Sequence, residues 1–163
     1  MVSDDMIRIS LQLDPDGWHG LKSEGIWVKA VKKLAGKMIV EVDNIPWFTR
    51  HLSCYDKITV ALINGELVLQ EIVERGGHST YRVYIREMND EKLQRLAEIK
   101  NLGCDWERGE FGGGQLYAID IPPNVDINEL YRLLQNGQID GSWLFEEGFV
   151  GHHLEGDPIP TVS

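Results

Sequence analysis

The sequence has few basic residues and no long hydrophobic run. Its 163 residues include 16 Lys and Arg against 26 Asp and Glu, which gives a formal net charge of −10. Binding nucleic acid without sequence preference requires a cationic face, so this balance excludes that class of function. The longest apolar runs, such as residues 58–63, are far shorter than the roughly twenty residues of a membrane span. We therefore expect neither a nucleic-acid nor a membrane partner.

Cysteine is also scarce, because Cys54 and Cys104 are the only two in the chain. The first five residues are acidic and polar, unlike the basic and apolar start of an export signal. We therefore expect a cytoplasmic protein in which both thiols are reduced. Neither cysteine lies in a CxxC motif or beside a cationic cluster, the settings that make a thiol nucleophilic.

Charge is distributed unevenly along the chain. The first 77 residues carry eleven acidic and nine basic residues, whereas the rest carry fifteen and seven. The Gly76-Gly77 pair is a turn signal between these two parts. The asymmetry predicts two units with different roles, over residues 1–77 and 78–150, followed by a flexible tail over 151–163.

The first unit is predicted to consist mainly of β-strands. Apolar and polar residues alternate in it, as they do in half-buried strands. The Asn64-Gly65 pair is typical of a tight hairpin, because a type I′ turn needs positive φ at both positions. Short strands joined by tight turns predict a small barrel-like unit. The predicted strands cover residues 7–13, 26–31, 37–42, 57–63 and 66–73.

The second unit combines strand and helix patterns. Helices are predicted to begin after Asn89 and after Asp126, because both are favourable N-cap residues, and to end near Gly103 and Gly137. The order strand, helix, strand, strand, helix, strand predicts a ferredoxin-like βαββαβ unit, and hence an α+β fold for the whole chain. The predicted strands of this unit cover residues 81–86, 104–107, 116–121 and 143–145.

Several short motifs are shared with a known family. They include Leu13-Asp14, Gly17-Trp18, Glu24-Gly25-Ile26-Trp27, Asp43-Asn44-Ile45-Pro46-Trp47-Phe48, Gly77-His78-Ser79-Thr80-Tyr81-Arg82-Val83, Leu102-Gly103-Cys104-Asp105-Trp106-Glu107 and Tyr117-Ala118-Ile119-Asp120-Ile121-Pro122. Over residues 7–148 the chain resembles a bacterial family described as domain of unknown function 4265. The resemblance implies a small soluble bacterial protein with no assigned catalysis. Members of such families often lie beside secreted toxins as their immunity proteins.

Two patterns that could carry catalysis have plainer interpretations. The three glycines 112–114 follow acidic residues and lack the Lys-Ser/Thr of a phosphate-binding loop, so they are better explained as a hairpin turn. Asp105 and Glu107 share one strand face beside Trp106, as a pair of catalytic acids could. They lie in a generally acidic region, so we interpret them as part of a solvated surface.

His78 lies next to two hydroxyl side chains. His78 and Thr80 share a strand face, whereas Ser79 points to the opposite one. No acid at a recognisable spacing would orient the histidine, so a turn-capping role for the hydroxyls is the better interpretation. We therefore expect no enzymatic activity, no cofactor and no metal site.

Two of the five tryptophans lie in short strands among acidic residues. Trp106 and Trp143 are expected on the second and fourth strands of the ferredoxin-like unit, which are the two edges of its sheet. Both indoles either anchor a partner within an acidic rim or pack inward against the helices, and the sequence leaves both alternatives open. The predicted partner-binding surface comprises Asp105, Trp106, Glu107, Glu110, Asp140, Trp143, Glu146 and Glu147.

These residues lead to two hypotheses about function. The first is an acidic immunity protein that occludes the active site of a basic toxin acting on nucleic acid or nucleotides, because opposite charge steers association. The alternative is a small-molecule sensor that uses a cleft between the two units. The residues expected to line that cleft are Trp18, Asn44, Trp47, His78 and Thr80.

Overall fold

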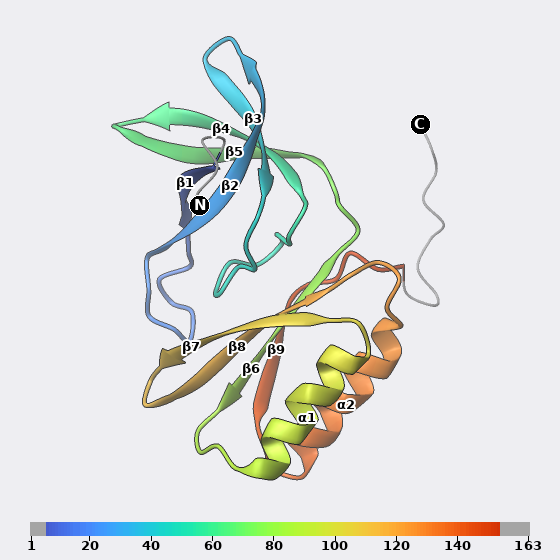
Figure 1. Ribbon diagram of the computed structural model, residues 1–163. Coiled ribbons are helices and arrows are strands. Elements are labelled where there is room, and N and C mark those ends of the chain that lie inside the picture. The colour runs from blue at the N-terminus through green and yellow to red at the C-terminus, as the bar shows by residue number, and fades with distance from the viewer. Residues whose placement is uncertain (1–5, 154–163) are drawn as a thin grey trace.

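The chain folds into two units (Figure 1). The computed structural model describes residues 6–153. The first unit is a closed five-stranded barrel, and the second is a four-stranded sheet covered on one side by two helices. This is an α+β fold with an N-terminal barrel, as the sequence predicts. Among the described residues, neither helix is long and apolar enough to cross a membrane.

The barrel is a meander in which each strand pairs with the next one along the chain. It closes where β1 and β5 pair in parallel, through Ser10 and Val68. Its interior is filled by inward-facing branched side chains such as Ile26 and Val40, which are fully buried. The five strands are β1 (Met6–Gln12), β2 (Ser23–Leu34), β3 (Lys37–Val42), β4 (Lys57–Ile63) and β5 (Glu66–Glu74).

The second unit has the ferredoxin-like order of elements. Its strands lie in the order β7-β8-β6-β9, and every neighbouring pair is antiparallel. β7 and β9 are therefore the two edges of the sheet. The elements are β6 (Ser79–Ile85), α1 (Asp90–Asn101), β7 (Asp105–Phe111), β8 (Gly114–Ile121), α2 (Ile127–Ile139) and β9 (Leu144–Phe149).

Local signals in the sequence place most of these boundaries correctly. The Asn89 side chain accepts a hydrogen bond from the Lys92 amide at 2.9 Å, and Asp126 accepts one from the Asn128 amide at 2.9 Å. Both are the helix caps that the sequence predicts. Residues 112–113 connect β7 to β8 with φ values of 58° and 81°, so the glycine run is a tight hairpin turn.

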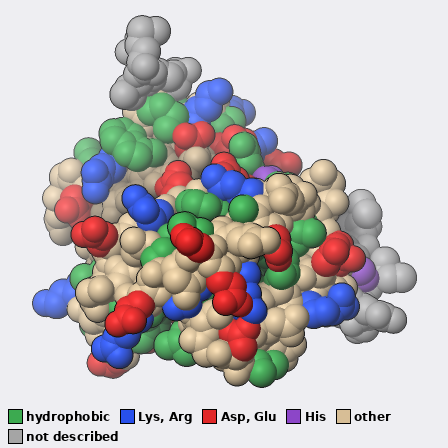
Figure 2. All heavy atoms as spheres, turned by 60° about the horizontal axis from the view of Figure 1, so that its bottom comes forward, with side chains coloured by type: hydrophobic (Ala, Val, Ile, Leu, Met, Phe, Trp, Pro, Cys, Tyr) green, Lys and Arg blue, Asp and Glu red, His purple; other side chains and the backbone are tan. Residues whose placement is uncertain are grey.

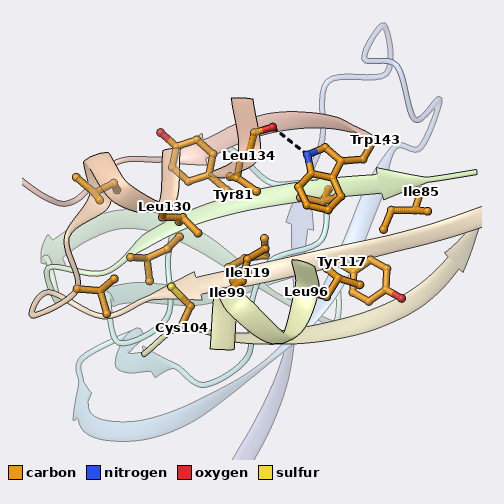
Figure 3. Packing of buried hydrophobic residues seen from close by; sticks show 14 residues of the cluster. Tyr81, Ile85, Leu96, Ile99, Cys104, Tyr117, Ile119, Leu130, Leu134 and Trp143 are labelled. Carbon is orange, nitrogen blue, oxygen red and sulfur yellow. Dashed lines mark hydrogen bonds between the residues drawn. The ribbon is translucent and has the colours of Figure 1, made fainter. Parts of the chain in front are cut away.

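The helix face of the sheet carries Tyr81, Val83 and Ile85 of β6, and it packs against the two helices. Leu96 and Ile99 of α1 are completely buried against it (Figure 3). This face and the two helices form a continuous apolar core. The core is stabilised by dispersion contacts and by the removal of apolar surface from water.

Trp143 belongs to this core. Its side chain is only 4% exposed, and its Nε1–H donates to the Leu134 carbonyl at 2.9 Å (Figure 3). The indole lies against Gly137 of α2, where a Cβ atom would overlap the ring. The role of Trp143 as an exposed anchor is therefore wrong. Gly137 does not end its helix but admits the indole, and α2 continues to Ile139.

The opposite face of the sheet, the barrel face, is built from three cross-strand rows. The barrel's β3–β4 loop, residues 43–56, lies over the second and third rows, so β6 is buried on both faces. The alternation of apolar and polar residues in β6 does not reveal the burial of this second face. From first to third, the rows are Leu116–Tyr84–Leu144, Ala118–Arg82–Glu146 and Asp120–Thr80–Phe149.

The chain beyond β9 is attached to β6. The Ser79 hydroxyl accepts a hydrogen bond from the Gly151 amide at 2.9 Å and lies 2.6 Å from His152 Nδ1. His152 Nε2 also lies 2.8 Å from the Pro122 carbonyl oxygen. The prediction of a flexible tail from residue 151 is wrong for these two residues, and residues 154–163 lie outside the described part of the chain.

Candidate binding site

A buried arginine connects the two units. Arg82 projects from the barrel face of β6 and is 1% exposed. Its Nε–H donates to Glu146 at 2.7 Å, and its terminal N–H groups donate to the carbonyls of Pro46, Phe48 and Thr49 at 3.1–3.3 Å. The guanidinium is therefore both charge-paired and hydrogen-bonded, as a buried charge has to be.

A second buried charge holds the same loop from its other side. The Glu24 carboxylate accepts from the amides of Trp47 and Phe48 at 3.1 and 2.8 Å, and from the Thr49 hydroxyl at 2.9 Å. The loop thus points its N–H groups at Glu24 and its carbonyls at Arg82. Glu24 lies two positions before Ile26, so both side chains point to the buried side of β2. An acid at such a position indicates a structural role, and sequence reasoning missed this pattern.

No residue of the β3–β4 loop lines the space over the first row of the barrel face, where a pocket of about 420 Å³ lies beside Leu144 and the buried Leu116. Trp18, from the β1–β2 loop, and Phe111, at the end of β7, are perpendicular to each other at 5.3 Å between ring centroids. Leu144 is 64% exposed and Trp18 is 52% exposed. We call this hollow the junction pocket. It is lined by Trp18, Arg82, Tyr84, Phe111, Gly112, Leu116, Leu144, Phe145 and Glu146.

The charged groups at the pocket are bound to one another. Glu146 contacts Arg82 through Oε1, and its Oε2 accepts from Trp18 Nε1 at 2.8 Å. The same Oε2 lies 3.6 Å from an Arg50 nitrogen. A further hollow of about 550 Å³ lies between the β1–β2 and β3–β4 loops and shares Trp18 with the junction pocket. We call it the loop hollow, and its polar lining includes His19, Thr49, Arg50 and His51.

Of the five residues predicted to line a cleft, only Trp18 lines the junction pocket. Asn44 caps a backbone amide of the barrel, accepting from Trp27 N at 2.6 Å. Trp47 packs over Gly109, and Thr80 is buried, with its hydroxyl 2.6 Å from that of Ser53. Trp47 and Thr80 are occupied by contacts between the units, because the loop of residues 43–56 packs directly on the sheet, and Asn44 is occupied by a contact within the barrel.

His78 has an acidic partner that sequence reasoning missed. Its Nδ1 lies 2.9 Å from Asp120 Oδ1, on the neighbouring strand β8, and its ring stacks with Tyr55 at 4.6 Å. Burial raises the pKa of Asp120, and the hydrogen bond with His78 opposes that shift. The nearby hydroxyls of Ser79 and Thr80 are bonded elsewhere, so this pair faces no nucleophile among the described residues.

The acidic residues predicted to bind a partner are divided between distant parts of the second unit. Asp105, Glu107 and Glu110 lie exposed on edge strand β7. Glu146 and Glu147 lie on β9, at the opposite edge of the sheet. Figure 2 shows acidic and basic side chains interspersed over the visible face rather than gathered by sign.

Like Glu146, two more of the predicted surface residues serve contacts within the chain. The Asp140 carboxylate at the end of α2 pairs with Arg95 of α1, and this hydrogen bond lowers the pKa of Asp140 to about 2. Glu147 accepts from the Tyr81 hydroxyl at 3.2 Å. Both contacts hold elements of the second unit together.

Trp106 also packs inward. Its Nε1–H donates to the Leu96 carbonyl of α1 at 3.2 Å, and its ring meets that of Tyr117 edge-on at 5.0 Å. The Lys100 ammonium lies 4.1 Å from the ring centroid. Trp106 and Trp143 therefore both fill space against the helices, which is the plainer of the two alternatives that the sequence leaves open.

Both cysteines are free and buried. Burial raises the pKa of the Cys104 thiol to about 12 and raises the pKa of Cys54 further still, and nearby acids add to both shifts. Neither thiol is suited to act as a nucleophile, because nucleophilic attack requires the thiolate.

The fold and the pocket define a two-unit α+β protein with an N-terminal barrel, a ferredoxin-like sheet and a preformed hollow where the two meet. The chain belongs to the family described as Domain of unknown function (DUF4265), whose model matches residues 24–145.

Comparisons with other proteins support the fold. A crystal structure of a hypothetical protein from Neisseria gonorrhoeae superposes with a TM-score of 0.66 at 14% sequence identity, covering 89% of this chain and 96% of the other. At that identity the likeness concerns the fold alone. A comparison with curated proteins found no match.

Proposed function

We propose that this protein is a non-enzymatic binding protein whose junction pocket takes a small, largely apolar ligand. The observation that carries the proposal is the pocket over the row of Leu116, Tyr84 and Leu144 on the barrel face, a pocket to which the β3–β4 loop contributes no residue. Ligand pockets typically measure about 300–1,000 Å³ and are lined mainly by apolar and aromatic side chains. The junction pocket, at about 420 Å³, has this size and lining.

The aromatic walls favour a ligand that contains a ring. Trp18 and Phe111 both line the pocket, and their rings are perpendicular to each other. A planar group can lie against one ring and meet the edge of the other, the two arrangements that aromatic groups prefer. Exposed apolar surface of this kind in a folded protein is typical of a binding site.

The pocket is also preformed. Glu24 and Arg82 fix the barrel loop at residues 46–49, and Glu146 fixes the Trp18 indole. A ligand that enters this pocket does not have to order its walls, which lowers the entropic cost of binding. Both cysteines are free, in keeping with the reducing cytoplasm in which we place the protein.

The test uses N-phenyl-1-naphthylamine, an uncharged two-ring probe that fluoresces in apolar sites. Leu144→Glu places a charge in the pocket at a side chain that is already exposed, so the fold should tolerate it. We expect saturable binding by the wild type and a loss of about tenfold or more in the variant, because a charge on an apolar contact surface is costly. Ile139→Glu is the matched control, since Ile139 is also an exposed apolar side chain, on α2, but lies outside the pocket.

Two results would contradict the proposal. One is the failure of the wild type to bind the probe at all. The other is an equal loss of binding in both glutamate variants, which would mean that the probe reports general surface hydrophobicity.

The acidic edge strand β7 supports a second candidate function. Asp105, Glu107 and Glu110 are exposed there, and burial together with neighbouring Asp105 and Asp43 raises the pKa of Glu107. An edge that gathers negative charge suits a cationic protein partner. The second candidate is therefore an immunity protein that occludes a basic toxin acting on nucleic acid or nucleotides.

Co-expression with the protein encoded by the neighbouring gene tests this candidate. Rescue of growth from that protein's toxicity should be lost with Glu107→Lys combined with Glu110→Lys. It should persist with Glu66→Lys, an exposed change on the barrel. Absence of toxicity in the neighbour, or rescue that survives the double variant, would remove the β7 edge from consideration.

A further inference from the structure

We infer that the ligand of the junction pocket carries one negatively charged group and that Arg50, which lines the neighbouring loop hollow and contacts Glu146 of the pocket, receives it. The inference rests on the function proposed above and adds the charge of the ligand and the residue that selects it. The class of ligand is a ring-bearing monoacid, such as an aromatic carboxylate or sulfonate.

The balance of charge at the pocket is the first reason. Glu146 is shared between two guanidinium groups, Arg82 at 2.7 Å and Arg50 at 3.6 Å. This cluster therefore retains one net positive charge beside an apolar cavity. Such a charge attracts an anion and repels a cation, with a strength that the 63% exposure of the Arg50 side chain reduces. An acid, rather than an amine, complements the pocket.

The second reason is that Arg50 has donors to offer, whereas four of the five N–H groups of Arg82 are already engaged. The Arg82 guanidinium is enclosed and donates to Glu146 and to three backbone carbonyls. The Arg50 side chain is 63% exposed, and its contact with Glu146 is longer than a hydrogen bond. A guanidinium carries five N–H donors, which match the geometry of a carboxylate.

The third reason is the position of Trp18 between two hollows. One side of Trp18 borders the apolar junction pocket. Trp18 also borders the loop hollow, where the polar groups are those of Arg50, His19, His51, Thr49 and Gln12, together with one carboxylate, Asp14. Trp18 Nε1 and the Arg50 guanidinium meet at the same oxygen of Glu146. A ring that lies against Trp18 can therefore extend an acidic group toward Arg50 without leaving the apolar floor.

The experiment compares two probes that differ chiefly in charge. 8-Anilinonaphthalene-1-sulfonate carries an acidic group on almost the same ring system as uncharged N-phenyl-1-naphthylamine. We expect Arg50→Gln to weaken sulfonate binding about tenfold or more, because it removes a charge-assisted hydrogen bond, and to leave binding of the uncharged probe unchanged. Arg50→Lys should retain part of the sulfonate affinity. Arg132→Gln, an exposed change on α2, is the charge-matched control.

Each outcome has a defined meaning. If neither probe binds the wild type, the proposed function fails and this inference fails with it. If both bind and Arg50→Gln affects neither, or weakens both equally, the pocket stands and the role of Arg50 is overturned. If Arg132→Gln weakens the sulfonate as much as Arg50→Gln does, the effect is one of overall charge, which also overturns the inference.

Discussion

The two faces of the four-stranded sheet are closed by different kinds of contact. The helix face packs against α1 and α2 through apolar side chains such as Leu96 and Leu134, which are completely buried. The barrel face is held by Arg82, Glu24 and the hydrogen bonds that they make with one loop, together with a small apolar cluster of Ile45, Cys54 and Ala118. On this second face a pocket lies over the first row of the sheet.

This difference shows why the candidate site lies where it does. An apolar interface is favourable in proportion to the area that it removes from water, so the helices cover their whole face. A polar interface is complete once its donors and acceptors are paired, as they are around Arg82. The barrel therefore closes the second and third rows, and the first row remains as the floor of the junction pocket.

The largest effect on stability is expected when the polar contacts of Arg82 on the barrel face are removed. Arg82→Met would leave Glu146 without its buried partner and three carbonyls without donors. We expect the free energy of unfolding to fall by about 3–5 kcal/mol, as when one member of a buried pair is removed. Urea denaturation measures this loss. The double variant Arg82→Met, Glu146→Gln should recover part of it, and no recovery would mean that the pair itself is unimportant.

The helix face should respond almost as strongly to the loss of one apolar side chain. Leu96→Ala removes three carbons from a site with no exposure, and we expect a loss of about 2–5 kcal/mol. Leu93→Ala, on the exposed side of the same helix, is the control and should cost far less. Equal losses at the two positions, measured by urea denaturation, would show that α1 is not packed as described.

A smaller effect is expected from Asp120, in the third row of the barrel face. Burial raises the pKa of Asp120 from its ordinary value of 3.8, with the hydrogen bond from His78 opposing the shift. Between that ordinary value and the raised one, the folded state binds more protons than the unfolded state. Asp120 therefore makes stability fall as pH rises through this window.

The variant Asp120→Asn cannot titrate, so it tests this sign directly. The unfolding free energy of the wild type minus that of Asp120→Asn should decrease as pH rises from below 3.8 through the raised pKa. Unfolding curves of both proteins over a pH series provide the measurement. A difference that stays constant or increases would show that the carboxyl is not destabilised by burial.

The smallest effect is expected on the acidic edge. Glu110→Lys changes an exposed side chain of β7. This side chain takes part neither in the apolar packing of the helix face nor in the polar contacts around Arg82 on the barrel face. The melting midpoint should correspond to a stability change within about 0.5 kcal/mol. A larger loss would place Glu110 in a structural contact and would weaken the second candidate function as well.

Most of the local structure could be predicted from the sequence. Strand alternation, the Asn64-Gly65 turn and the caps Asn89 and Asp126 are local signals, and each placed its element correctly. Gly137 misled for a physical reason: a glycine after an apolar helix stripe usually ends the helix, whereas here it makes room for an indole.

Much less of the candidate site could be predicted. Trp18 was named as a cleft residue, but its neighbours Phe111, Tyr84 and Leu144 were not. Arg82 alternates with apolar residues in β6, and this pattern is the same whether the second face of a sheet meets water or another unit. The acids were grouped by their proximity in sequence, but the fold places β7 and β9 at opposite edges.

The sequence by itself determined the elements, their order and the apolar core beneath the helices, because periodicity, turns and caps act over a few neighbouring residues. Only the tertiary structure decided what covers the other face of the sheet. That choice depends on pairings such as Arg82 with the loop at residues 46–49, more than thirty positions away. No local pattern encodes such a pairing, because it exists only once both units have folded.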